Sequence, residues 1–363
     1  MGKKVVGIFF GGRSAEHEIS MLSATSIMEA IPKSRYSVVA IGVRKDGGFV
    51  YYPGGKAILH GTDASKVRLA PSGIPVTFQF GKRPGLIALS NKRFLKRLDV
   101  VFPVLHGTYG EDGTMQGLLE IAGLPYVGPG VLGSAIGMDK DVTKRLWRDA
   151  GLPIADFLVA RSSQKNWTYA QIIKKLGTPF FVKPAVAGSS VGVHKVTSSR
   201  QFVVAMRDAF SYCEKVLIER MVQGREIECS VLGGENPKVS LPGAVIPTHS
   251  FYSYEAKYLD PDGAQFEIPA RMAKASIRLV QDIVRKAYVS LGLEGMARVD
   301  GFLDDAGVFT LNEVNTIPGF TKISMYPKLW KVSGFPFPDL LDRLLQDAMD
   351  RYARGRKLKT GRL

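Results

Sequence analysis

Two short stretches are most informative about this chain: Arg-Val-Asp at residues 298–300 and Asn-Glu-Val-Asn at residues 312–315. Alternate residues of a strand point to one face, so neighbouring strands here would direct Asp300 and Glu313 at a common place. These carboxylates and the amide oxygen of Asn315 form a hard-oxygen set that suits Mg²⁺ shared with nucleotide phosphates. Arg298 would then meet charge that develops in a transition state. Taken alone, the pattern also fits a surface hairpin with solvated charges.

The composition is that of an ordinary globular protein with a strong positive charge. Its 363 residues are enough for about two or three domains with buried cores. The 49 Lys and Arg residues exceed the 33 Asp and Glu residues by 16, which suits anionic small ligands or nucleic acid. Six of the cations lie in residues 351–363, RYARGRKLKTGRL, which predicts a frayed, solvated terminus. A nucleic-acid-binding arm is the alternative, although no aromatic-rich or recognition-helix pattern accompanies it.

Cysteine usage and hydropathy bear on the compartment. Cys213 and Cys229 have no C-x-x-C spacing, which argues for a reducing compartment and against structural disulfides or zinc. The apolar run at residues 5–10 is too short for a signal sequence. No run approaches the roughly 18 apolar residues of a membrane span. We therefore expect a soluble, cytoplasmic protein without membrane contacts.

Residues 1–129 are predicted to form an N-terminal α/β domain that ends near Gly128. A strand at 5–10, a helix at 16–31 and a strand at 36–43 form a β-α-β opening, which implies a parallel sheet. Ligand groups would gather at the carboxyl ends of its strands. A further strand is expected at 99–105, before a loop at 106–113 and a helix at 114–122. Residues 46–98 are expected to be irregular apart from an inserted hairpin.

Two further α+β domains are predicted, a smaller central one at 130–221 and a C-terminal one at 222–363. In the central domain the expected elements are helix 139–150, strand 154–160, helix 168–176, strands 179–183 and 191–196, helix 199–212 and strand 215–221. In the C-terminal domain they are strands 226–233 and 238–246, a long loop 248–267, helix 271–290, strands 296–303 and 307–314, and a helix from about Pro338.

The segment 7–14, GIFFGGRS, is close to a P-loop motif, but Arg13 stands in place of the lysine. A P-loop needs its first glycine in the phosphate loop, whereas Gly7 is expected inside the apolar strand. The turn can still bring its backbone close to a ligand, with Glu16 and Ser20 pointing inward at the start of the helix.

The segment 188–192, GSSVG, matches the G-x-S-x-G motif of serine hydrolases, which would make Ser190 a nucleophile. That motif must lead from a strand into a helix, whereas here it joins two expected strands, so a hydrolase is disfavoured. A Gly/Ser hairpin flap over phosphates fits better, with Lys183 before it as a point charge. Lys140 at a helix start supports this interpretation, and Glu219 with Glu226 would flank a place for ribose and adenine.

Six motifs together resemble one family, the D-alanine–D-alanine ligases of the ATP-grasp superfamily, in order and in spacing. They are GGRSAEHEIS (11–20), HGTYGEDG (106–113), GMDK (137–140), KPAVAGSSVG (183–192), YEAKY (254–258) and NEVNTIPGF (312–320). The resemblance covers residues 5 to about 330. It implies a three-domain ATP-grasp fold and ATP-dependent ligation of two D-alanine molecules through a D-alanyl phosphate, for peptidoglycan synthesis.

The resemblance also assigns roles to residues. For ATP it implies Lys140, Lys183, Gly188, Ser190, Glu219, Glu226 and Lys257, and for two Mg²⁺ (or Mn²⁺) ions it implies Asp300, Glu313 and Asn315. For the first D-alanine the resemblance implies Glu16 and His106, with Ser189 and Tyr258 completing a hydrogen-bonded set. For the oxyanion it implies Arg298 and the Gly319 N–H. For the second substrate it implies Ser324 and Met325. The loop 248–267 would act as a lid. His106 would orient the first substrate or transfer a proton, or is a satisfied loop histidine.

Several alternatives stay open at this stage. Tyr258 is typical of dipeptide-forming relatives, whereas D-lactate-using relatives tend to carry Phe there, and Lys322 leaves D-serine or D-lactate open as the second substrate. His17 stands where many relatives have Arg. A non-catalytic, basic nucleic-acid-binding protein is the remote alternative. The family is commonly dimeric, and neither the general base nor a monovalent-cation requirement follows from the sequence.

Overall fold

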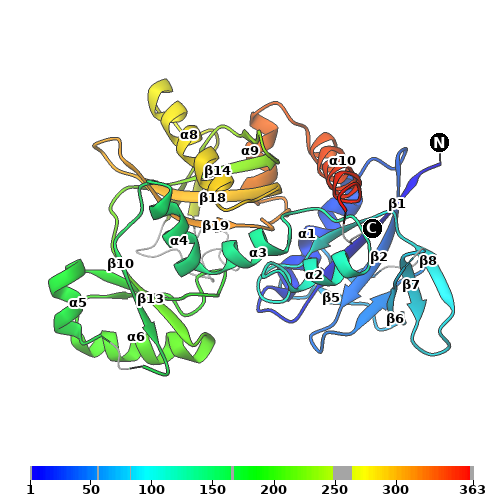
Figure 1. The fold of residues 1–363 in the computed structure, drawn as a ribbon, viewed down its shortest axis with the longest axis horizontal. Helices are drawn as coiled ribbons and strands as arrows, with labels where there is room; N and C mark the ends of the chain where they lie inside the picture. The colour runs from blue at the N-terminus through cyan, green and yellow to red at the C-terminus, as the bar shows by residue number, and fades with distance from the viewer. Residues whose placement is uncertain (1, 55–56, 82, 165–166, 248–263, 360–363) are drawn as a thin grey trace.

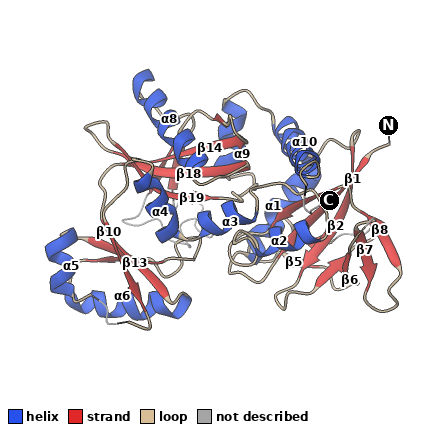
Figure 2. Cartoon of the chain, in the orientation of Figure 1, coloured by secondary structure: helices blue, strands red, loops and turns tan. Residues whose placement is uncertain are grey.

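The structure, a computed structural model, describes residues 2–54, 57–81, 83–164, 167–247 and 264–359. Figures 1 and 2 show three groups of elements: an N-terminal sheet with its helices, a small sheet flanked by α5 and α6, and a third sheet beside α8. Mixed α/β architecture with separate sheets agrees with the predicted fold class. Within the described residues, no helix is both long enough and apolar enough to cross a bilayer.

The N-terminal sheet is mixed, with strand order β8-β7-β6-β3-β2-β1-β9. Its parallel part consists of β1 (Lys4–Gly11), flanked by β2 (Tyr36–Val43) and β9 (Val100–Val104), as the β-α-β opening predicts. Helix α1 (His17–Ala30) joins β1 to β2, and α2 (Thr114–Ile121) follows β9. The predicted parallel sheet is therefore correct for these three strands only.

Residues 46–98 are more ordered than the sequence suggested, and this expectation was wrong. They form β3 (Phe49–Tyr51), β4 (Ile58–Leu59), β5 (Arg68–Leu69), β6 (Ile74–Gln79), β7 (Gly85–Ala88) and β8 (Phe94–Arg97). Four of them extend the sheet with antiparallel pairing. The connections β6–β7 and β7–β8 are short, and short hairpins can only join antiparallel strands. Such short strands carry too few alternating residues for a clear pattern.

The central sheet has strand order β10-β13-β11-β12 and is antiparallel throughout. Its elements are β10 (Phe157–Arg161), α5 (Tyr169–Leu176), β11 (Phe180–Pro184), β12 (His194–Val196), α6 (Ser199–Tyr212) and β13 (Lys215–Arg220). Side chains of α5 and α6 pack on this sheet in a separate hydrophobic cluster. Helices α3 (Val131–Met138) and α4 (Lys140–Asp149) precede it, and α3 was not predicted.

The C-terminal sheet centres on β14 (Arg225–Gly233), β18 (Gly295–Leu303) and β19 (Phe309–Asn315). It also contains β15 (Lys238–Val239), β16 (Gly243–Pro247) and β17 (Ala264–Glu267), and its helices are α8 (Lys274–Ser290), α9 (Met325–Val332) and α10 (Phe337–Gly355). The strand predicted at 238–246 is interrupted before β16, where Pro242 has no N–H to donate. Helix α9 was not predicted.

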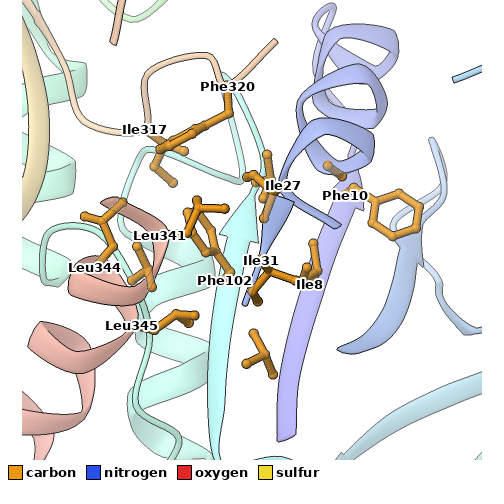
Figure 3. Packing of buried hydrophobic residues seen from close by; sticks show 14 of the residues in the cluster. Ile8, Phe10, Ile27, Ile31, Phe102, Ile317, Phe320, Leu341, Leu344 and Leu345 are labelled. Atoms are coloured by element: carbon orange, nitrogen blue, oxygen red, sulfur yellow. The ribbon is translucent and has the colours of Figure 1, made fainter. Parts of the chain in front are cut away.

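Helix α10 returns to the N-terminal sheet. Leu341, Leu344 and Leu345 of α10 share one buried cluster with Phe102 of β9 and with Phe320 (Figure 3). The expected frayed terminus from residue 351 is wrong for its first part, because α10 continues to Gly355. The Arg351 guanidinium donates hydrogen bonds to the carbonyls of Gly128 (2.6 Å) and Tyr126 (2.9 Å), which holds this turn in place.

Candidate active site

The face of β14, β18 and β19 carries the charged residues of the opening motif. The register places Asp300 directly opposite Glu228 on one side and Glu313 on the other, while Arg298 lies opposite Asn315. Asp300 and Glu313 therefore share a face, as their spacing predicted. The register shifts between Asp300 and Gly301, where β19 contains one extra residue, Asn312. Such a bulge redirects a side chain.

Arg298 is held by two carboxylates. Its Nε and Nη2 donate to the two oxygens of Asp300 at 2.8 and 2.6 Å, and Glu228 Oε2 lies 3.0 Å from Nε. Burial opposes the charge of Arg298, but Asp300 and Glu228 outweigh it and raise its pKa. The Asn315 amide donates to Asp300 Oδ2 at 2.9 Å. Glu228 has no role in the sequence analysis, although it lies two residues after Glu226 on the same strand face.

The donor set of Asp300, Glu313 and Asn315 suits a hard cation only in part. Across the described residues, no group of three or more His, Cys, Asp or Glu side chains is placed to hold a metal ion. Two carboxylates and one amide leave an octahedral ion to be completed by water or by phosphate oxygens. The set therefore fits Mg²⁺ that arrives with a nucleotide.

A cavity between the central and C-terminal sheets gathers most of the residues assigned to ATP. Its lining includes Lys140, Lys183, Ser190, Glu219 and Glu226, together with Phe181, Asn312 and Glu313. Gly188 lies instead against an adjoining cavity. Lys257 falls outside the described residues.

The lysines of the nucleotide cavity are held by carboxylates and carbonyls. Lys183 Nζ contacts Glu219 Oε2 and donates to Asn312 Oδ1 at 3.2 Å. Lys140 Nζ donates to the carbonyl of Ala187 at 2.7 Å and lies 3.5 Å from Glu313. Burial opposes the charged form of Lys183, but the charge of Glu219 outweighs it and raises the pKa of Lys183.

A second lysine on Glu219 was missed by the sequence analysis. Lys144 Nζ contacts Glu219 Oε1, and its side chain is 1% exposed. Burial disfavours ionised Glu219, but the charges of Lys144 and Lys183 prevail and lower its pKa. Burial also lowers the pKa of Lys144, and Glu219 opposes this only in part. The available signal was helical spacing, since Lys144 lies four residues after Lys140.

The segment 188–192 connects β11 to β12 and therefore joins two antiparallel strands. This is the flap topology that was predicted, and it excludes the strand-to-helix turn that a nucleophilic Ser190 requires. Ser189 and Ser190 have φ angles of 52° and 59°, in the left-handed region that non-glycine residues seldom occupy. Strained backbone of this kind is concentrated at ligand clamps. Gly7 lies inside β1, so the P-loop reading is excluded too.

The adjoining cavity gathers the residues assigned to the amino-acid substrates. Its lining includes Glu16, His106, Ser189, Arg298, Gly319, Ser324 and Met325, and also Glu111, Glu228, Glu313 and Asn315. Glu313 thus lines both cavities. Tyr258 lies outside the described residues. Lys322 is exposed and lines a neighbouring groove with α1, not this cavity.

The Glu16 side chain lies against Gly107 and against the flap at residues 188–192. Its Oε1 accepts a hydrogen bond from the Ser189 hydroxyl. A Cβ atom on Gly107 or Gly188 would lie 2.8 or 2.9 Å from Glu16 Oε2. Both glycines therefore allow the backbone to approach this carboxylate, which brings the start of α1 and the flap together.

His106 is buried and has a partner near each ring nitrogen. Nδ1 lies 2.9 Å from the carbonyl of Ile317, and Nε2 lies 3.1 Å from the Ser23 hydroxyl. Burial lowers the pKa of His106 despite the nearby charge of Glu16. This geometry matches a satisfied, neutral histidine that positions the loop at 317, and its part in substrate orientation or proton transfer stays a prediction.

Glu111 is a further buried carboxyl that the sequence analysis gave no role. It accepts hydrogen bonds from the N–H groups of Gly107 (2.7 Å) and Ile317 (2.8 Å). Burial and the charge of Glu16 raise the pKa of Glu111 to about 8, against the opposing effect of these N–H groups. Its place in the motif HGTYGEDG was the available signal.

The turn before α9 positions Ser324. The Ser324 hydroxyl accepts from the Thr321 N–H at 3.0 Å and lies 2.8 Å from the Thr321 hydroxyl. A Cβ on Gly319 would lie 2.7 Å from Ser324 Oγ. Gly319, Thr321 and Ser324 therefore form one tight wall of the substrate cavity.

Two consecutive parts of this chain match the two halves of one protein family. Residues 5–129 match the family described as D-ala D-ala ligase N-terminus, and residues 146–346 match D-ala D-ala ligase C-terminus. The D-alanine--D-alanine ligase of Shouchella clausii is 48% identical over 99% of this chain and 98% of its own.

Solved structures with a similar fold carry the names of the same family. The D-alanine-D-alanine ligase from Coxiella burnetii has a TM-score of 0.85 at 35% identity and covers 98% of this chain and 97% of its own. VanG D-Ala:D-Ser ligase from Enterococcus faecalis has a TM-score of 0.84 at 32% identity, with 96% and 100% covered. The family and fold class indicated by the six motifs are thereby confirmed, and this chain belongs to the D-alanine–D-alanine ligase family.

Proposed function

We propose that this protein joins two D-alanine molecules to D-alanyl-D-alanine and converts ATP to ADP and phosphate. The observation that carries the proposal is Glu313, which lines both the nucleotide cavity and the substrate cavity. A phosphate at the end of one cavity can therefore meet a carboxylate bound in the other. Similarity to D-alanine ligases over the whole chain supports this choice of substrates.

The reaction would proceed in two steps. A carboxylate oxygen of the first D-alanine bonds to the γ-phosphorus while the bond to ADP breaks, which gives D-alanyl phosphate. The amine of the second D-alanine then attacks the carbonyl carbon and loses a proton, and inorganic phosphate leaves. Glu16 would bind the first ammonium group, with the Ser189 hydroxyl holding the Glu16 carboxylate.

Charge on the reacting groups would be met by residues of the sheet face. Asp300, Glu313 and Asn315 would hold Mg²⁺ or Mn²⁺, which neutralises phosphate charge when it is bound. Arg298 and the Gly319 N–H would stabilise the oxyanion, and Ser324 with Met325 would contact the second substrate. Lys257 and Tyr258 would act from a lid that keeps water from the acyl phosphate.

The biological setting follows from the product. We place the enzyme in the cytoplasm as a homodimer that supplies peptidoglycan precursors and thereby supports cell shape. D-Serine is the second candidate for the incoming substrate, because the Enterococcus relative is named for it. D-Lactate is the third.

The test is phosphate release from Mg-ATP with D-alanine, beside L-alanine, D-serine, and D-alanine with D-lactate, each product being identified by mass. Release with D-alanine alone, yielding the dipeptide, supports the proposal. Asp300→Asn should abolish release, whereas Asp305→Asn, exposed on the same hairpin, should not. Turnover only with another amino acid, or none, would contradict it. Salt-sensitive nucleic-acid binding that survives Asp300→Asn, without turnover, would favour the remote alternative.

A further inference from the structure

Lys144 is a buried charge that touches neither cavity. It lies on α4, its side chain is 1% exposed, and it is absent from the linings of the nucleotide and substrate cavities. Its Nζ contacts Glu219 Oε1 and lies 3.5 Å from the carbonyl of Leu311. A buried charge is costly unless it is paired, so the position needs a physical reason.

Glu219 is shared between two lysines from different elements. Its Oε1 contacts Lys144 of α4, and its Oε2 contacts Lys183 of β11, which lines the nucleotide cavity. Two ammonium groups and one carboxylate sum to +1. If Lys144 were neutral, the remaining pair of Glu219 and Lys183 would sum to zero.

The other charged residues of the cavity do not replace this charge. Lys140 lies 3.5 Å from Glu313, and Arg220 lies 3.1 Å from Asp156, so each of these cations has a carboxylate beside it. The group of Lys144, Glu219 and Lys183 therefore contributes +1 beside the cavity, and it would contribute 0 without the charge of Lys144. A triphosphate would be attracted less in the second case, and the low dielectric of a buried site strengthens the effect.

We propose that Lys144 is a positioning residue that offsets the charge of Glu219, so that Lys183 is held in place and still presents a net positive charge to the nucleotide phosphates. The inference rests on the proposed use of ATP and deepens it. Lys144 touches no substrate in this arrangement and acts only through Glu219 and Lys183. The alternative is that Lys144 serves stability alone.

The test compares the affinities of ATP and adenosine, measured by calorimetry at low salt, in four proteins: wild type, Lys144→Met, Glu219→Gln and the double variant. The net charges of the three-residue group are +1, 0, +2 and +1. The ratio of ATP affinity to adenosine affinity should rise with this net charge. We expect it to be at least tenfold lower than wild type in Lys144→Met and equal to wild type in the double variant. In Glu219→Gln it should be no lower than in wild type. Adenosine lacks phosphates, so the ratio cancels general damage to the base and ribose site.

Two outcomes would overturn the inference: equal losses of ATP and adenosine affinity in Lys144→Met, or a double variant whose ratio stays low. If Lys144→Met does not fold, the double variant and Glu219→Gln still test the order. Lys174→Met, exposed on α5, is the control and should leave both affinities unchanged. The affinity ratios do not depend on which amino acid is the substrate. A wild-type protein that binds ATP more tightly than adenosine but releases no phosphate with D-alanine would contradict the proposed function. The same result would leave the inference about Lys144 intact.

Discussion

At the level of single residues, Glu111 links two segments that are far apart in the sequence. Its carboxyl accepts hydrogen bonds from the N–H groups of Gly107, which follows β9, and of Ile317, which follows β19. Its pKa is raised to about 8 by burial and by the charge of Glu16. The folded protein therefore keeps a proton on Glu111 that the unfolded chain releases from about pH 4.5 upward.

This shift makes a prediction for Glu111→Gln. A raised carboxyl pKa gives stability that is fully present below the unfolded pKa and is lost progressively as the pH rises toward about 8. Gln cannot titrate, so we compare the free energy of unfolding of wild type with that of the variant. The difference, wild type minus variant, should fall between pH 5 and pH 8 by at least about 1.4 kcal/mol, which is equivalent to one pKa unit. Thermal unfolding across this range measures it, with Glu29→Gln, exposed on α1, as control. A difference that stays constant with pH would show that Glu111 is already ionised.

Residue identities were largely predictable where a motif carried them, and contacts were not. Asp300 and Glu313 share a face because strand alternation is a local property. Lys144, Glu111 and Glu228 went unassigned because their roles arise from pairing with Glu219, with loop amides and with Arg298. Such pairings join positions many residues apart, and no local pattern encodes them.

At the level of elements, helix α9 packs closely on strand β16. A Cβ on Gly243 would lie 2.5 Å from Met325 Cε and 2.8 Å from Leu329 Cδ2. Met325 also lines the substrate cavity. The absence of a side chain at Gly243 therefore sets the position of a residue assigned to the second substrate.

Gly243→Ala should push α9 and Met325 away from the sheet. We expect a loss of about 1–3 kcal/mol in stability, the usual cost of overpacking, and a higher D-alanine concentration at half-maximal rate. Gly234→Ala is the matched control, because the nearest atom to its Cβ would be Glu294 Oε1 at 3.6 Å. Denaturant unfolding and D-alanine titration would test both. Unchanged D-alanine dependence in Gly243→Ala would argue against Met325 as a substrate contact.

Long, periodic elements were predicted from the sequence almost to the residue. Strand β2 and helix α6 have the expected bounds, β18 begins one residue earlier than expected, and β19 begins two residues later and ends one residue later. Helix α3 was missed because its short sequence is rich in Gly, Ser and Ala, and α9 because Pro327 lies in its first turn. Proline is tolerated there, since the first N–H groups of a helix lack intrahelical partners.

At the level of the whole molecule, the last described helix packs on the N-terminal sheet. Leucines of α10 share a buried cluster with strands β1 and β9 and with the loop at 317–320 (Figure 3). The amphipathic pattern of α10 predicts a buried face but does not name its partner. The substrate cavity depends on this packing, because the same loop contributes the carbonyl of Ile317 to His106.

Arg351→Ala should weaken this closure. The guanidinium donates to the carbonyls of Gly128 and Tyr126, and its side chain is 19% exposed. Hydrogen bonds to charged groups contribute about 1.5–3 kcal/mol each, so the loss of both should lower the free energy of unfolding by at least about 3 kcal/mol. ATP affinity at 25 °C should stay unchanged, because the nucleotide cavity is built from other elements.

Arg354→Ala is the control. Its side chain is 66% exposed and lies 3.9 Å from Glu294, a distance at which an exposed ion pair contributes little to stability. Denaturant unfolding measures the loss in the free energy of unfolding of each variant. Equal losses would mean that the basic charge of the terminus, and not the two carbonyl contacts, holds α10 against the N-terminal sheet.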